Sequence, residues 1–86
     1  MKITDIKIRK LLDASKMRAI VSVTFDDEFV VHDIKVIESA DKLFLAMPSR
    51  QLPNGNFVDI THPTGHLFRS QLEKEVITEY KKAVDA

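Results

Sequence analysis

The chain has 86 residues, no cysteine, and thirteen basic and thirteen acidic side chains, so its formal net charge is zero. A chain of this length forms one domain, so we expect residues 1–86 to be a single unit, strand-rich over residues 1–61. The lack of cysteine excludes disulfides and thiolate metal sites, and balanced charge removes the simplest argument for binding nucleic acid or a membrane. The N-terminal segment alternates charged and apolar residues, unlike a signal peptide or membrane span. We therefore expect a cytoplasmic protein with no membrane partner.

The charge is unevenly distributed along the chain. Residues 1–18 carry six basic and two acidic side chains, whereas residues 26–41 carry six acidic and one basic. Segregation of this kind can create a basic face that a net charge of zero conceals. The interpretation we favour is that the two segments neutralise each other in the fold.

Four segments in the first half of the chain have the pattern of β-strands. They are "KITDIKIR" (residues 2–9), "MRAIVSVTF" (17–25), "FVVHDIKVI" (29–37) and "LFLAM" (43–47). Apolar residues alternate with polar ones in the first two, which is the period of a strand with one covered face. The connections are short, and a parallel pair would need a dozen or more residues of crossover. The sequence therefore predicts an antiparallel meander.

The polar stretch "SRQLPNGNFVDITHP" (residues 49–63) contains a predicted reversal. Asn54 and Gly55 form the dipeptide that most readily takes the left-handed conformations of a tight hairpin turn, and Pro53 precedes them. "NFVDI" would then be a shorter fifth strand. Pro48 and Pro63 restrict the chain at the two ends of the stretch.

After Pro63 the period changes to that of a helix. Phe68, Leu72, Val76 and Tyr80 recur at steps of four, which predicts one amphipathic helix over residues 66–84. We expect Thr64 to be its cap. The fold class is therefore α+β: an antiparallel sheet of about five strands followed by one C-terminal helix.

The predicted sheet has apolar side chains on both faces, but one helix can cover only one of them. Simple alternation in the third strand separates two sets: Val30, Ile34 and Val36 on one side, and Phe29, Val31 and Ile37 on the other. A second copy of the chain would cover the remaining face. We therefore predict a homodimer.

The sequence contains no pattern that favours catalysis. His62 and His66 are four residues apart, but Pro63 disfavours helical geometry at His62 and there is no cysteine to complete a metal site. We interpret His32 as a hydrogen-bonded, half-buried side chain, and Ser49 lies in no nucleophile motif. We expect neither an enzyme nor a cofactor or metal.

Recognition by polar side chains remains as the candidate function. Arg50 and Gln51 lie beside the predicted turn, and Arg69 and Lys74 lie on the helix. These are side-chain types that bind phosphates or base edges. Ordinary solvated charge explains the same residues, and taken alone they favour that simpler interpretation.

The order of several motifs resembles the SpoVG family of bacterial septation regulators. The likeness runs from about residue 3 to residue 80 and is most specific in "FVVHDIKVIE", "AMPSR" and "DITHP". It implies a small antiparallel sheet with a C-terminal helix, assembled as a dimer. It also implies a cytoplasmic regulator of asymmetric septation and sporulation that binds DNA and RNA.

The chain departs from the family pattern in its basic residues. Arg50 and Arg69 match basic positions of the family, whereas Gln51 and Val58 stand where its members often carry a charge. Each phosphate left without a cation lowers affinity for nucleic acid and flattens its salt dependence. Two functions therefore stay open: a dimer that binds nucleic acid directly, or an adaptor that binds other regulatory proteins.

Overall fold

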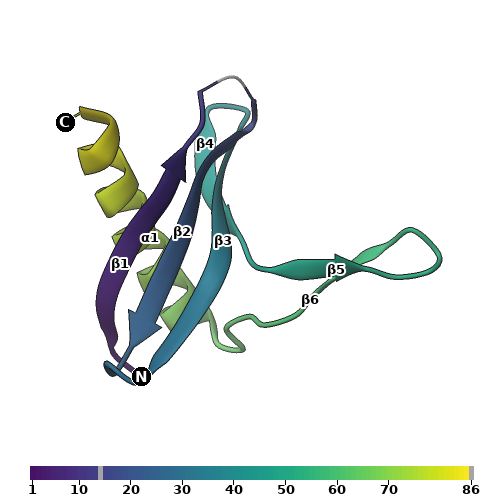
Figure 1. Ribbon diagram of the computed structural model, residues 1–86, viewed down its shortest axis with the longest axis horizontal. Helices are drawn as coiled ribbons and strands as arrows, with labels where there is room; N and C mark the ends of the chain where they lie inside the picture. The colour runs from purple at the N-terminus through teal and green to yellow at the C-terminus, as the bar shows by residue number, and fades with distance from the viewer. Residues whose placement is uncertain (14, 86) are drawn as a thin grey trace.

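A four-stranded antiparallel sheet with one helix on one face forms the body of the molecule (Figure 1). The computed structural model describes residues 1–13 and 15–85. The sheet contains β1 (Ile3–Leu11), β2 (Met17–Phe25), β3 (Phe29–Ser39) and β4 (Lys42–Ala46), in the spatial order β1-β2-β3-β4. The helix, α1, spans His66–Asp85. The predicted α+β class, the meander and the C-terminal helix are confirmed.

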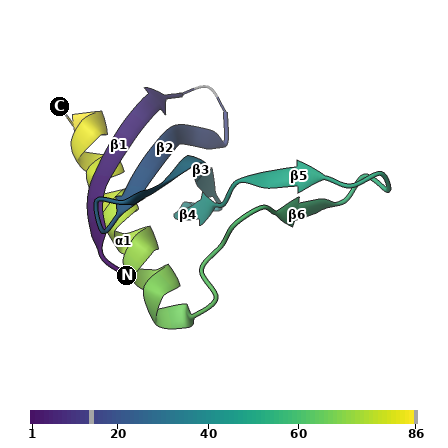
Figure 2. The same cartoon turned by 60° about the horizontal axis from the view of Figure 1, so that its bottom comes forward.

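The predicted fifth strand exists but does not join the main sheet. It is β6 (Phe57–Asp59), and it pairs only with the short strand β5 (Ser49–Gln51) in a separate two-stranded sheet. Pro48 follows β4 closely and cannot donate to a ladder, so the chain leaves the sheet there. The expectation of one sheet of about five strands was therefore wrong. Residues 48–60 form a projecting hairpin, which we call the arm (Figure 2).

The core lies between the sheet and α1. Alternate positions of β2 contribute four of its buried side chains, as the sequence predicted, and the others come from β3, from β4 and the residue that follows it, and from α1. The buried apolar residues are Ala19, Val21, Val23, Phe25, Ile34, Val36, Leu45, Met47, Leu72 and Val76. The rings of Phe25 and Phe68 pack with their centroids 5.8 Å apart, which fixes the start of the helix against β2.

A β-bulge in β3 changes which of its residues face the core. Ser22 of β2 lies opposite two residues of β3, His32 and Asp33, and Asp33 has a φ of 63°. The extra residue reverses the alternation, so Val31 packs against the core while Val30 is exposed. The prediction that Val30 shares a face with Ile34 was therefore wrong, because simple alternation assumes an uninterrupted ladder.

The start of α1 also differs from the prediction. The helix begins at His66, and the carbonyl of Gly65 accepts the N–H of Arg69 at 3.1 Å. Gly65 therefore occupies the cap position that the sequence assigned to Thr64. The predicted apolar stripe is confirmed at Phe68, Leu72, Val76 and Tyr80, which are buried or packed against the core.

The face of the sheet turned away from α1, which we call the open face, is covered by no other element of the described residues (Figure 2). Paired residues share a face of a sheet, so Ile20 and Lys35 lie together there, as do Ile37 and Phe44. This face is more polar than the sequence predicted, because the bulge moves Val31 to the core side. Assembly as a homodimer stays a prediction.

Candidate functional site

The loop of the arm contains the prolines and the glycine that the sequence singled out. Pro53, Asn54 and Gly55 form a three-residue loop, which is closed by a 2.7 Å bond from the N–H of Leu52 to the carbonyl of Asn56. Gly55 has a φ of 91°, whereas Asn54 is not left-handed. The Asn54 side chain instead accepts the N–H of Asn56 at 3.0 Å. The predicted reversal is confirmed, in the form of a turn followed by one left-handed residue.

The base of the arm lies between the other two prolines. The carbonyl of Pro48 accepts the N–H of Ile60 at 2.7 Å, which holds the two chain segments together where they leave the body. Pro63 lies in the connection from β6 to α1, and its carbonyl is 2.9 Å from Nδ1 of His62. The prolines therefore restrict both ends of the arm.

Arg50 and Gln51 lie on opposite faces of the arm. Arg50 pairs with Val58, and Gln51 pairs with Phe57. The amide of Gln51 donates to the carbonyl of Gly55 at 3.2 Å, so this side chain is engaged by its own loop. Arg50 is exposed and belongs to no ion pair found within residues 1–13 and 15–85. Of the two, Arg50 is the side chain available to a ligand.

The two helix residues point in different directions. Nε of Arg69 is 3.9 Å from Oε1 of Glu73, one turn along α1, and the second Glu73 oxygen accepts the backbone N–H of Leu45 at 3.5 Å. Lys74 is exposed. Lys74 lies five positions after Arg69, which turns the two side chains about 140° apart around the helix axis. The arm extends away from α1 (Figure 2), so one chain does not bring Arg50, Arg69 and Lys74 together.

Basic side chains that the sequence analysis did not single out lie on the open face. Lys7 pairs with Ser22, and Lys10 and Lys35 both pair with Ile20. The charge excess of residues 1–18 was the signal that could have found two of them. The expected neutralisation by residues 26–41 is limited, because Arg18 and Glu38, 2.6 Å apart, make the only ion pair found between these segments in the described chain.

His32 also lies on this face. Its Nδ1 is 2.8 Å from the hydroxyl of Ser22, so the predicted hydrogen bond is confirmed. The side chain is exposed, however, and the expectation that it is half-buried was wrong. The bulge at Asp33 turns His32 out of the alternation that would have placed it beside Ile34.

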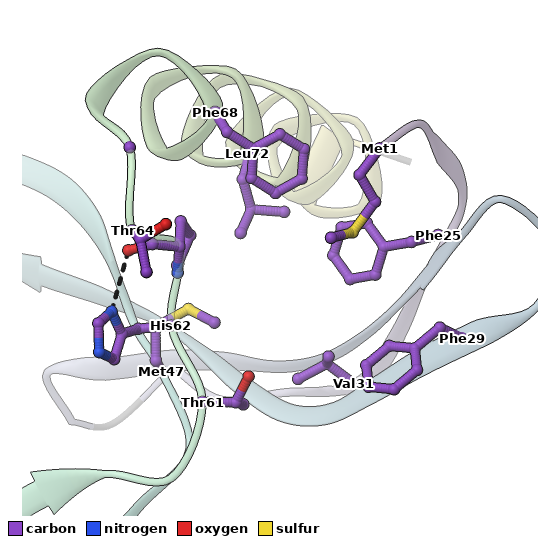
Figure 3. A pocket seen from close by; sticks show the side chains of 12 residues that line it. Met1, Phe25, Phe29, Val31, Met47, Thr61, His62, Thr64, Phe68 and Leu72 are labelled. Carbon is purple, nitrogen blue, oxygen red and sulfur yellow. Dashed lines mark hydrogen bonds between the residues drawn. The ribbon is translucent and has the colours of Figure 1, made fainter.

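An apolar groove of about 350 Å³ lies between the end of β2, the start of β3 and the start of α1. Figure 3 shows Phe29 and Val31 on one side of the groove, Phe68 and Leu72 on the other, and His62 at the connection from the arm. Its lining is mainly apolar, which suits an apolar side chain of a partner.

Neither a metal-binding cluster nor a membrane-spanning helix occurs in the part of the chain that the structure describes. No group of three or more histidine or acidic side chains there is arranged to hold a metal ion. The helix that the structure describes is not long and apolar enough to cross a membrane.

Comparison with known proteins identifies the family. The SpoVG family model matches residues 1–82. A protein of Caldanaerobacter subterraneus subsp. tengcongensis named "Putative septation protein SpoVG" is 59% identical over 83 residues, covering 96% of this chain and 91% of the relative. A protein of the same name from Thermoanaerobacter sp. strain X514 is 57% identical over 83 residues, covering 96% of this chain and 90% of the relative. Another from Clostridium acetobutylicum is 56% identical over 82 residues, covering 95% of this chain and 86% of the relative. The chain therefore belongs to the SpoVG family.

Proposed function

We propose that this chain is a cytoplasmic, homodimeric regulator of septation and sporulation that binds DNA or RNA. The relatives are named as septation proteins, which supports the cellular role. The observation that carries nucleic-acid binding is the exposed Arg50 on a projecting arm, whose guanidinium belongs to no ion pair found in the described part of the chain. An exposed guanidinium of this kind can bind a phosphate without breaking an ion pair inside the protein.

The arm supports the dimer as well. A two-stranded hairpin alone is marginally stable in water, and this one exposes 67% of Phe57 and 65% of Ile60. Packing Phe57 against a second copy would bury it and leave Arg50 exposed, because the two side chains lie on opposite faces of the arm. Twofold symmetry would then present Arg50 twice to one nucleic-acid strand or duplex.

The apolar groove favours a second candidate function, that of an adaptor for other regulatory proteins. Its lining includes the aromatic rings of Phe29 and Phe68, and such grooves commonly receive an apolar anchor from a protein partner. An adaptor would influence septation or transcription without touching nucleic acid.

Fluorescence anisotropy with labelled DNA and RNA fragments at 50 mM salt separates the two functions. We expect the wild type to bind and Arg50→Ala to bind several-fold more weakly while keeping its circular dichroism spectrum. Lys16→Ala, an exposed cation on the connection between β1 and β2, is the charge-matched control and should bind like the wild type. Absence of binding by the wild type would leave the adaptor as the better candidate.

A further inference from the structure

Two β-bulges lie close to Ser22 on the open face, one on each neighbouring strand. On β1 the ladder is interrupted at Arg9, and on β3 Ser22 faces both His32 and Asp33. Bulges re-aim side chains and are common beside functional sites. Here the interruptions bring side chains of three neighbouring strands to one point.

These side chains form a shallow pocket of about 370 Å³ together with Ile20. Ser22 is 5% exposed, and its hydroxyl is 2.8 Å from Nδ1 of His32 and 3.5 Å from Nη1 of Arg9. Guanidinium, hydroxyl and imidazole groups can all donate hydrogen bonds to an oxygen. Asp33 is the one acidic residue of the lining.

Three further cations surround this pocket. Lys7 lies directly opposite Ser22, and Lys10 and Lys35 lie on either side of Ile20. The ion pairs found among the described residues use Arg18, Arg69 and Lys82. None of these ion pairs involves Lys7, Lys10 or Lys35, so these three cations can contact a ligand. A long anion could therefore contact several cations in succession.

The same face continues into an apolar part at β4. Phe44 pairs with Ile37, and 40% of Phe44 is exposed. An exposed ring beside a basic surface is the arrangement on which unpaired bases stack, and sheet faces are used in this way for single strands. The open face thus combines groups for phosphates with a group for a base.

We propose that the open face binds single-stranded nucleic acid, with one phosphate held in the pocket by Arg9, Ser22 and His32. Lys7, Lys10 and Lys35 contact neighbouring phosphates, and a base stacks on Phe44. This inference rests on the proposed function but assigns a surface distinct from the arm. The carboxylate of Asp33 opposes any anion in the pocket, so affinity comes from several contacts along a strand and free phosphate binds poorly.

The test measures the affinity of the full chain for a labelled twelve-nucleotide oligo-dT, oligo-U and a twelve-base-pair duplex at several salt concentrations. Arg9→Gln and Lys35→Gln should each weaken binding of single strands about fivefold to tenfold at 50 mM salt and reduce the salt slope by about 0.7. Asp33→Asn should strengthen the binding of single strands, because it removes the carboxylate that opposes an anion in the pocket. Lys81→Gln, which removes an exposed cation of α1, is the control and should change neither quantity.

Amide chemical shifts provide a readout that does not depend on a variant folding. Oligo-dT should shift the resonances of Ser22, His32 and Phe44, whereas 10 mM inorganic phosphate should leave them nearly unchanged. Equal shifts with phosphate, tighter binding of the duplex, or no effect of Arg9→Gln and Lys35→Gln would each overturn the inference. If Arg50→Ala weakens binding and the open-face variants do not, this inference fails alone; if the wild type binds nothing, the proposed function fails with it.

Discussion

The hydroxyl of Ser22 and Nδ1 of His32 are 2.8 Å apart on adjacent strands of the open face. Ser22 is the single buried polar residue within the described ranges 1–13 and 15–85. Its hydroxyl finds this partner because the bulge in β3 aims His32 at it. The geometry of the open face therefore depends on the left-handed residue next to His32, which is Asp33.

Replacing Asp33 by valine should lower the free energy of unfolding by about 1–2 kcal/mol, because a β-branched residue resists a φ of 63°. Asp33→Asn should be nearly neutral, since asparagine tolerates this conformation. Urea denaturation measures both. Lys35→Val, at a regular position of the same strand, is the control, and equal losses for the two valine variants would show that the bulge does not constrain residue 33.

Gly55→Ala should open the arm more often without unfolding the body. The φ of 91° at Gly55 is unfavourable for alanine, although an added Cβ would meet no atom within 4 Å. A cost of about 1 kcal/mol corresponds to exchange of the Leu52 amide hydrogen that is about fivefold faster. Exchange at Val23, in the core, should not change, and Gly55→Asn should have a smaller effect. Unchanged exchange at Leu52 in the alanine variant would contradict this prediction.

Leu72→Ala should destabilise the fold by about 2–5 kcal/mol, because Leu72 is buried between α1 and the sheet. Leu67→Ala makes the same chemical change on the same helix, but Leu67 is 90% exposed, so its effect should stay within about 0.5 kcal/mol. The comparison cancels helix propensity and isolates packing. Similar urea midpoints for the two variants would mean that α1 does not dock as described.

Phe57→Ser should convert the proposed dimer to a monomer, because it removes the largest exposed apolar side chain of the arm. Sedimentation velocity at micromolar concentration should show twice the chain mass for the wild type and one chain mass for the variant. Val84→Ser, at the exposed end of α1, is the control and should remain dimeric. A monomeric wild type would refute the dimer, and a dimeric Phe57→Ser variant would place the interface elsewhere.

The elements were predictable from sequence, but their departures from regularity were not. Apolar residues at every second position identify the strands, and apolar residues three or four positions apart identify the helix, since burial of one face imposes periods of about 2 and about 3.6 residues. The bulge at Asp33 leaves no comparable pattern in the sequence. One extra residue in a strand cannot be told apart from a polar side chain that occupies one position of a regular strand. Pro48 could be recognised as the end of β4, but not as the point where the next strands form a separate sheet.

The candidate site was predictable only in part for a related reason. Arg50 and Gln51 could be placed beside a turn from their neighbours in sequence. The contacts of these residues in the fold, however, could not be predicted. The Gln51 amide donates a hydrogen bond to Gly55 of the loop, and strand register places Lys10 and Lys35 on either side of Ile20. Charge counted along a chain does not specify charge across a sheet, because residues far apart in sequence become neighbours.

Nucleic-acid binding is tested most directly by a salt titration of affinity for wild type, Arg50→Ala and Arg69→Ala. We expect measurable binding at 50 mM salt and a slope that Arg50→Ala reduces by about 0.7–0.9 for each phosphate that the arginine neutralises. Arg69→Ala should change the slope less, because Glu73 already lies 3.9 Å from its guanidinium. No binding at 50 mM salt, or a slope and affinity that Arg50→Ala leaves unchanged, would contradict nucleic-acid recognition by the arm.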